Sequence, residues 1–259
     1  SLESLAAYIK EHPDQKLFGK STYTDFINSY SPFLSSRILN KDGSINRENL
    51  IAVLNLLKDI SISYELMSSY PDGVYGPDNY WDLASKVKLA TCTCSGFQDS
   101  MFYLGIVTYV NGSFTALDQT VIPSCEIGIN SSSDKQELCK EFIEVLLSKE
   151  IGVNDFYDGF SINKEALLLC ASVDRSDYAA VSDIENEDGS QSLITFGPLT
   201  EEQTQNLVKA CDNAYKIAYN DSQIISAIKE EAQNLLTNSK PVEEIADQII
   251  EKTKIYLSE

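Results

Sequence analysis

Cysteine, histidine and paired carboxylates are the side chains with which this chain could do chemistry. The cysteines are Cys92, Cys94, Cys125, Cys139, Cys170 and Cys211. No two of them form a Cys-x-x-Cys pair, and the only histidine, His12, stands beside Pro13 in a polar segment. Because a zinc site needs four clustered ligands, or three and a water, this spacing predicts no metal site and no cofactor.

The single histidine also limits nucleophilic catalysis. A Ser-His-Asp triad or a Cys-His pair would have to use His12, which lies at a predicted helix end and is followed by a rigid proline. Glycoside hydrolysis needs no histidine, but it needs two carboxyl groups about 5 to 9.5 Å apart across a cleft. The 39 acidic residues show no local constellation of this kind. We therefore predict no catalytic residues and no enzyme, with a carboxylate glycoside hydrolase as an alternative.

The cysteines are interpreted first as small buried hydrophobic residues. Cys139 and Cys211 fall on the apolar stripes of predicted helices. Cys92 and Cys94 lie two apart in a strand-like stretch, so they share one face and are poorly placed for a disulfide with each other. One disulfide between distant segments is the alternative.

Charge and length narrow the class of protein further. The 259 residues suit one large domain or two small ones. A net charge of −19 repels phosphate backbones and anionic lipids, which excludes nucleic acid as a partner. The apolar runs, such as residues 104–110, are much shorter than the ~18 residues of a membrane-spanning helix.

Apolar periodicity predicts the elements that must position any site. Helical spacing occurs in residues 2–11, 23–36 and 47–60, with a turn at residues 40–43. Residues 70–81 are loop-like and hold three tyrosines and the only tryptophan. Residues 86–94 and 104–110 have strand-like patterns, and residues 97–102 could begin a helix.

The second half combines one further strand with several helices. Residues 125–130 are strand-like, and a capping box of Ser133 with Gln136 predicts a helix through Ser148. That helix is expected to bury Leu138, Phe142, Val145 and Leu146. The acidic residues 183–192 are predicted to form a solvated loop. Helices are predicted from Thr200 through Ile217, from Asp221, and from Pro241 to Tyr256. Strands interleaved with helices and followed by a helical carboxy-terminus indicate an α/β or α+β architecture.

A family resemblance is carried by residues 122–147. They contain Gly128-Ile129-Asn130, a serine-rich cap, and the helical stretch Glu137-Leu-Cys-Lys-Glu-Phe142. This resembles the extracellular solute-binding proteins of ABC importers, in the carbohydrate-binding, maltose-binding-protein-like family. In that family such a strand, cap and helix return the chain to the first lobe; Cys139 stands here for the usual alanine. Residues 86–97, 160–167 and 224–256 are similar to further family segments in the same order.

The resemblance implies an α/β, periplasmic-binding-protein-like fold. Residues 1–120 and 170–259 would form the second lobe, and residues 121–169 a strand-helix segment of the first lobe. Much of the amino-terminal lobe is not found in the chain, which begins in helices of the second. Because the family traps solute between lobes, we expect this chain alone to bind sugar no more tightly than millimolar.

The function implied is that of an extracellular solute-binding component of an ABC transporter. Its partners would be a sugar or oligosaccharide and the permease subunits, and we expect a monomer. The resemblance also implies a cell-surface lipoprotein, anchored through a segment absent from this chain. A non-catalytic interaction or sensory lobe derived from that family is the alternative.

Sugar sites combine aromatic rings, which stack on apolar sugar faces, with polar groups for the hydroxyls. The loop residues Tyr75, Tyr80 and Trp81 supply rings, although Trp81 could equally be a core anchor. The resemblance places Phe97 as the pocket aromatic. The remaining predicted ligand-binding residues are Gln98, Asp99, Glu126, Asp158 and Phe160.

Overall fold

The computed structural model describes residues 1–70, 88–123, 125–154, 159–185, 190–218, 221–254 and 256. Helices dominate these residues, and the strands among them form two-stranded sheets. The predicted mixed α/β class is confirmed at this level. No helix among the described residues is long and apolar enough to cross a membrane.

The chain divides into two compact units. Unit 1 comprises Ser1–Thr91, Leu117–Ile122 and Tyr215–Glu259, and unit 2 comprises Cys92–Ala116 and Pro123–Ala214. These boundaries differ from those of the predicted lobes. Residues 92–116 and 170–214 fall in one unit with residues 123–169, whereas the predicted division at residues 120 and 169 separates them.

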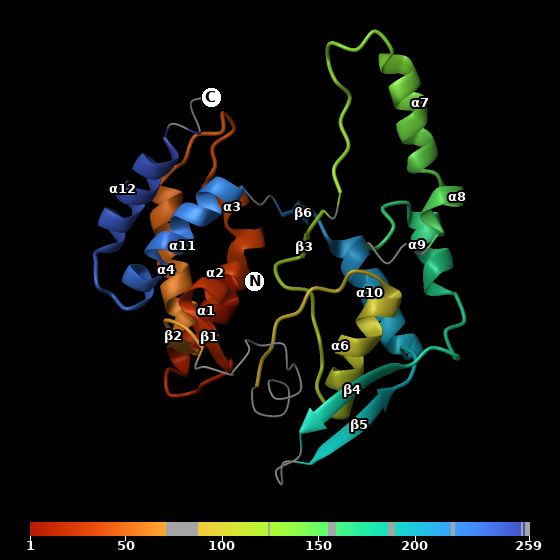
Figure 1. Cartoon of the computed structure of the whole chain (residues 1–259), viewed down its shortest axis with the longest axis horizontal. Helices are drawn as coiled ribbons and strands as arrows, with labels where there is room; N and C mark the ends of the chain where they lie inside the picture. The colour runs from red at the N-terminus through yellow and green to blue at the C-terminus, as the bar shows by residue number, and fades with distance from the viewer. Residues whose placement is uncertain are drawn as a thin grey trace. The chain divides into compact units, whose positions relative to one another are not determined.

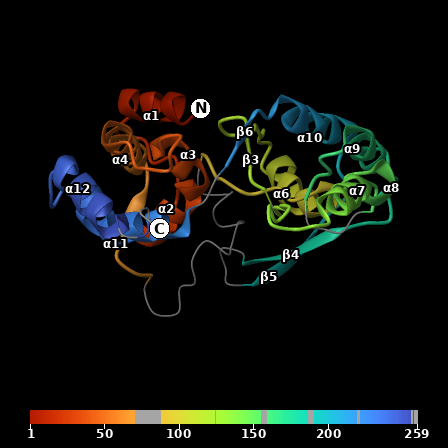
Figure 2. The same cartoon turned by 90° about the horizontal axis from the view of Figure 1, so that it is seen from above.

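Unit 1 is built mainly from helices. They are α1 (Leu2–Glu11), α2 (Tyr23–Tyr30), the 3-10 turn η1 (Ser31–Phe33), α3 (Ser35–Ile38), α4 (Arg47–Ser61), α11 (Ser222–Leu236) and α12 (Val242–Thr253). In Figures 1 and 2, α1, α4, α11 and α12 lie together, and α4 contacts the other three. The helices predicted at 2–11 and 47–60, and those beginning after Asp221 and Pro241, are confirmed.

Local signals in the sequence explain where these helices begin and end. The side chains of Thr22, Asn46 and Asp221 accept hydrogen bonds from backbone amides of the first turns of α2, α4 and α11. The helix predicted over residues 23–36 is interrupted by η1, where Pro32 cannot donate a backbone hydrogen bond. The predicted turn at 40–43 closes with the Gly43 amide donating to the Asn40 carbonyl at 3.0 Å, with Gly43 at a φ of +84°.

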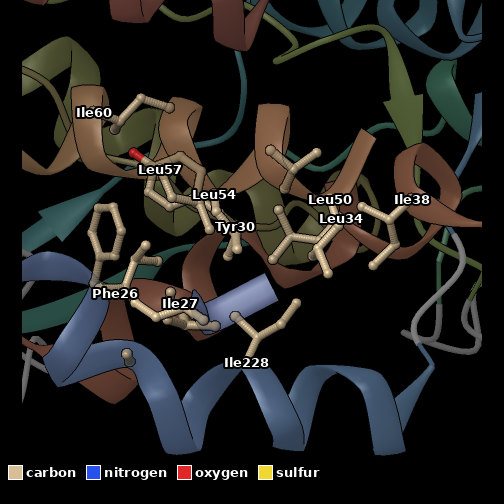
Figure 3. Packing of buried hydrophobic residues seen from close by; sticks show 14 of the residues in the cluster. Phe26, Ile27, Tyr30, Leu34, Ile38, Leu50, Leu54, Leu57, Ile60 and Ile228 are labelled. Carbon is tan, nitrogen blue, oxygen red and sulfur yellow. The ribbon is translucent and has the colours of Figure 1, made fainter. Parts of the chain in front are cut away.

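The core of unit 1 is continuous. It contains 25 buried hydrophobic residues drawn from all of its longer helices. Figure 3 shows the apolar face of α4, with Leu50, Leu54 and Leu57, packed against Phe26 and Ile228 of the facing helices. Fully burying one such side chain contributes about 1.5 to 3 kcal/mol, so this face contributes strongly to holding the helices together.

Two short parallel sheets tie distant segments of unit 1 together. Strand β1 (Lys20–Thr22) pairs with β2 (Glu65–Met67), and β3 (Thr120–Val121) pairs with β6 (Lys216–Ile217). Beside β3, the buried Asp118 carboxylate accepts from Arg37 at 2.8 Å and lies 3.2 Å from the Lys216 ammonium. These ion pairs hold residues 117–122 against α3 and β6.

Unit 2 contains helices and one hairpin. The helices are α6 (Phe97–Tyr109), α7 (Gln136–Leu146), α8 (Lys149–Gly152), α9 (Lys164–Ala171) and α10 (Glu201–Asn213), and the hairpin is β4 (Ala180–Glu185) with β5 (Gln191–Phe196). Residues 183–185 and 191–192 lie in these two strands, which corrects the ends of the solvated loop predicted at 183–192; residues 186–189 lie outside the described residues. The helix predicted to run from Thr200 through Ile217 ends at Asn213, and Ile217 lies in β6 of unit 1.

The strand predicted at 104–110 is wrong, because these residues form most of the second half of α6. Phe97, Met101 and Leu104 recur at helical spacing and are buried together, which outweighs the β-branched residues that follow. Gly105 then permits a close approach, since a Cβ there would lie 2.5 Å from Cγ of Phe196. The α6 surface is thereby shaped to receive β5.

The other two predicted strands lie outside any sheet. Residues 88–94 belong to no described strand, although the amides of Lys88 and Leu89 donate to the Leu17 carbonyl. Residues 125–130 run as an extended segment in Figure 1 and belong to none of the described strands. A strand-like sequence pattern can therefore be present where no neighbouring strand supplies hydrogen bonds.

A capping box forms at the start of α10, whereas the one predicted at Ser133 does not form. Thr200 and Gln203 exchange both hydrogen bonds at the start of α10. The Gln203 amide also donates to the Leu104 carbonyl at 3.1 Å and to the Thr108 hydroxyl at 2.8 Å, which joins α10 to α6. Ser133 instead accepts from the Lys135 amide, and α7 begins at Gln136 without a side-chain cap.

Candidate functional site

The predicted aromatic loop cannot be placed. Tyr75, Tyr80 and Trp81 lie outside the described residues, and so does Asp158. Of the predicted ligand-binding residues, Phe97, Gln98, Asp99, Glu126 and Phe160 are described. All five belong to unit 2.

Phe97 is the first residue of α6 and is only 3% exposed. Its ring meets that of Phe160 edge-on at 5.2 Å, and the Arg175 guanidinium lies 5.3 Å from its centroid. Leu167 and Leu207 belong to the same buried cluster. Phe97 and Phe160 are thus brought together, as part of a core; this packing accounts for the aromatic pair without a solute.

The polar candidates are dispersed. Gln98 and Asp99 follow Phe97 in α6 and are half-buried. The Asp99 carboxylate accepts a hydrogen bond from the Ser95 hydroxyl at 2.6 Å, so it fixes the start of the helix. Glu126 is exposed in the extended segment before α7. The described polar side chains therefore do not converge on one point with Phe97.

The largest departure from expectation is α7. Leu138 is 61% exposed, Phe142 58% and Val145 58%, and Leu146 is exposed as well, whereas the sequence predicts that this helix buries them. Among the described residues of unit 2, α8 is the element that α7 contacts most. The helix is strongly amphipathic, yet nothing described in unit 2 covers its apolar face.

The segment before α7 runs beside the same face and leaves a groove between the two. Ile127, Gly128 and Ile129 line an apolar groove of about 450 Å³ together with Leu138, Cys139, Phe142 and Ile143. Figure 1 shows this segment running beside α7 before the chain turns into the helix. Within the described parts of the chain, no backbone hydrogen bond pairs residues 125–129 with another segment. We call residues 125–146 the α7 arm.

Sequence reasoning identified the segments of the α7 arm but not its exposure. Two features of the sequence could have indicated this exposure. Residues 136–146 are strongly amphipathic, and the strand-like run before them has no adjacent strand in the sequence with which to pair. A strand followed by an amphipathic helix is typical of a βα unit, in which the strand joins a sheet and the apolar face of the helix packs on that sheet. The sheets among the described residues of unit 2 do not include residues 125–130.

A second groove, of about 460 Å³, lies in unit 1 and is more polar. Its lysine Lys16 already donates to the carbonyls of Ile62 and Tyr64, at 2.7 and 3.1 Å. Asp59 is paired with Lys10 at 2.7 Å. The Tyr64 hydroxyl is bonded to that of Tyr30, and burial raises the pKa of Tyr30 to about 12. These groups are engaged within the fold, so the groove offers little to a ligand.

The candidate catalytic groups have structural roles where the structure describes them. The His12 ring stacks on Tyr8, and its Nδ1 lies 2.9 Å from the Tyr8 carbonyl at the end of α1. The six cysteines, all among the described residues, form no disulfide. No group of three histidine, cysteine or acidic side chains in the described part of the chain is placed to hold a metal ion.

No family model matches the chain, and no characterised protein matches it significantly in sequence.

Proposed function

We propose that the protein is an extracellular solute-binding component of an ABC importer and binds a carbohydrate. The observation that carries this proposal is the α7 arm. It lies within residues 122–147, the segment that most resembles the family, and in that family the corresponding strand and helix return the chain to the first lobe. When no sheet of that lobe contacts this strand and helix, we expect the helix to keep its apolar face uncovered and the strand residues to stay unpaired, as they do in the α7 arm.

Physical chemistry supports a covering partner for the arm. An exposed apolar patch rimmed by charged residues is typical of a surface that packs against another unit. An unpaired extended segment presents free amides and carbonyls, which favour addition to a sheet edge. Both features occur together on the α7 arm, and its opposite side carries charges such as the Glu137–Lys140 pair at 2.6 Å.

The solute-contacting rings in this proposal are those of Tyr75, Tyr80 and Trp81, which lie outside the described residues. Phe97 and Phe160 are engaged in the core of unit 2, which shifts the proposed stacking to Tyr75, Tyr80 and Trp81. Stacking contributes about 0.5 to 1.5 kcal/mol beyond area burial, and millimolar binding requires about 4 kcal/mol. Several rings and hydroxyl contacts must therefore act together.

Trp81 provides the test, because it is the only tryptophan in the chain. Titration of the protein with a panel of oligosaccharides should change tryptophan fluorescence saturably, at millimolar concentrations. Trp81→Phe should remove the optical signal and weaken the binding heat measured by calorimetry. Tyr8→Phe, in an exposed ring on α1, is the matched control and should bind as the parent does.

Two results would contradict the proposal. One is the absence of saturable heat or fluorescence change with every sugar, from protein shown to be folded by circular dichroism. The other is release of reducing ends from an oligosaccharide, which would indicate a carboxylate glycoside hydrolase instead.

A non-catalytic interaction or sensory lobe is the second candidate, and the exposed face of α7 favours it. Such a lobe would use the apolar groove to bind another protein rather than to complete a sugar-binding fold. The sugar titration separates the two, because the interaction lobe would show no saturable sugar binding.

A further inference from the structure

The groove of the α7 arm has the length of one added β-strand. Residues 125–129 run as an extended segment beside α7 (Figure 1), and five extended residues span about 17 Å. The 11 residues of α7 span about 16 Å, so the segment and the helix match in length. A Cβ at Gly128 would meet no atom within 4 Å, so the space beside the segment is open. A partner strand of about five or six residues would therefore fit along the groove.

The backbone of this segment is available for pairing. Within the described chain, no amide or carbonyl of residues 125–129 forms a backbone hydrogen bond with another segment. An added strand can pair with such groups, and its successive side chains then point to opposite faces. One face of that strand would meet the exposed apolar side chains of Leu138 and Phe142 on α7. The partner therefore needs apolar residues at alternate positions.

Charge selects among the possible partners. Unit 2 holds 19 of the 39 acidic residues and 6 of the 20 basic residues, which gives it a net charge of −13. On the α7 arm, the carboxylates of Glu126, Glu141 and Glu144 are exposed and have no ion-pair partner among the described residues. Lys135 is exposed on the arm as well, but one cation leaves an excess of negative charge. A basic partner is favoured, whereas a second copy of the chain and an anionic lipid surface are repelled.

We propose that the α7 arm binds an extended polypeptide segment in which apolar and basic residues alternate, and that this segment adds to residues 125–129 as a β-strand. Its apolar side chains cover Leu138 and Phe142. Its basic side chains lie beside Glu126, because alternation places Glu126 on the side opposite to Ile127, which lines the groove. The inference rests on the proposed function only in that the α7 arm takes a covering partner; it does not require sugar binding.

The test uses the full chain and a labelled peptide of four valine–lysine repeats with blocked ends. Fluorescence anisotropy should give saturable one-to-one binding with a Kd of about 10 to 100 µM at low salt. Binding should weaken roughly tenfold at high salt, because salt screens exposed charges. In the complex, hydrogen exchange at alternate amides of residues 125–129 should slow at least about tenfold, because these amides then donate to the added strand.

Two control peptides separate strand addition from adsorption to an acidic surface. A block of valines followed by a block of lysines has the same charge without the alternation. Alternating valine and glutamate keeps the alternation but reverses the charge. Each should bind at least about fivefold more weakly than the valine–lysine repeat. Equal binding of either control peptide would contradict the proposal.

Variants of the protein locate the binding surface. Phe142→Ser should weaken peptide binding roughly tenfold, since it removes an exposed ring that lines the groove. Ile162→Ser is the matched control, because Ile162 is 80% exposed in unit 2 but does not line the groove. Glu126→Lys should weaken binding about threefold to tenfold, whereas Glu11→Lys, on exposed α1 of unit 1, should bind as the parent does.

Three results would overturn the proposal: no binding of the valine–lysine repeat, unchanged binding by Phe142→Ser, or unprotected amides at residues 125–129 in the complex. A dimer of the chain alone that Phe142→Ser dissociates, measured by sedimentation, would instead assign the groove to a second copy. Oligosaccharide titration of the same protein, followed through Trp81, separates failure of this proposal from failure of the proposed sugar binding.

Discussion

Helices α4 and α7 have similar sequence patterns but different surroundings. Both carry leucines and valines at helical spacing. In unit 1, α1, α11 and α12 cover the apolar face of α4, and Leu50, Leu54 and Leu57 are buried. In unit 2, Leu138, Phe142 and Val145 of α7 stay more than half exposed. Amphipathicity predicts which face of a helix is apolar, but the fold decides whether anything covers that face.

The two units differ in the same way. Among the described residues, the cluster of unit 1 holds 25 buried residues, and the cluster around Phe97 in unit 2 holds five. Since each buried apolar side chain contributes roughly 1.5 to 3 kcal/mol, the described core of unit 1 contributes more to stability than that of unit 2. In unit 2, much of the apolar surface of α7 is exposed. This contrast supports the proposal that the α7 arm packs against a further partner.

Truncating the α4 core should give the largest effect. Leu54→Ala removes a fully buried side chain and should lower the free energy of unfolding by about 2 to 5 kcal/mol, measured by urea denaturation. Leu138→Ala makes the same chemical change on the exposed face of α7 and should cost about 0.5 kcal/mol or less. Equal losses for the two variants would mean that α7 is covered in solution.

The close approach of α6 and β5 predicts a smaller loss in unit 2. Gly105→Ala would place a Cβ 2.5 Å from Cγ of Phe196, so Phe196 must shift. We expect a loss of about 1 to 3 kcal/mol, because overpacking outweighs the better helix propensity of alanine. Gly128→Ala is the control, since no atom lies within 4 Å of its Cβ position. A stabilising Gly105→Ala would show that β5 does not rest on α6.

Substitution of the two candidate helix caps, Thr200 and Ser133, should change the stability of the protein by different amounts. Thr200→Ala removes a complete capping box from α10 and should cost about 1 kcal/mol. Ser133→Ala should cost almost nothing, because Ser133 does not cap α7. Urea denaturation followed by circular dichroism measures both. A similar loss of unfolding free energy for both variants would indicate that Ser133 caps α7 as predicted.

The smallest of the expected effects is the contribution of Glu231 in unit 1 to the pH dependence of stability. Burial acts to raise the pKa of Glu231, but hydrogen bonds from Asn234 and Lys252 bring it below its ordinary value of 4.5. Folding therefore favours the ionised carboxylate. Its contribution is present above pH 4.5 and falls as the pH drops through the lowered pKa.

Glu231→Gln should thus destabilise the protein by about 1 kcal/mol or less at pH 7, and the difference from the parent should shrink towards pH 3. Urea midpoints measured at both pH values test this. Glu230→Gln is the matched control, because Glu230 is an exposed neighbour that also pairs with Lys252. A constant difference across this range would exclude titration of Glu231 as the cause.

Much of unit 1 could be predicted from sequence. Its helices combine strong apolar periodicity with caps such as Asn46 and Asp221, and local signals of this kind need no knowledge of the rest of the fold. Unit 2 was less predictable. The β-branched run at 104–110 favoured a strand, but burial of Leu104 with Phe97 and Met101 made it a helix.

The candidate site was predictable only in part. Phe97 and Phe160 were both identified, and they do meet, yet their contact is in a core. The identity of the neighbours around a ring depends on contacts between distant segments, which composition and periodicity do not contain. For the same reason the sequence located the apolar residues of α7 correctly but not their exposure.

Hydrogen exchange followed by mass spectrometry tests the contrast between the two units most directly. Amides of α4 should exchange slowly, because they are bonded within a helix packed in a continuous core. Amides of residues 125–129 should exchange within seconds, since nothing in the described chain accepts their hydrogen bonds. Protection of residues 125–129 comparable to that of α4 would contradict the account, because it would show that the α7 arm is already paired and covered.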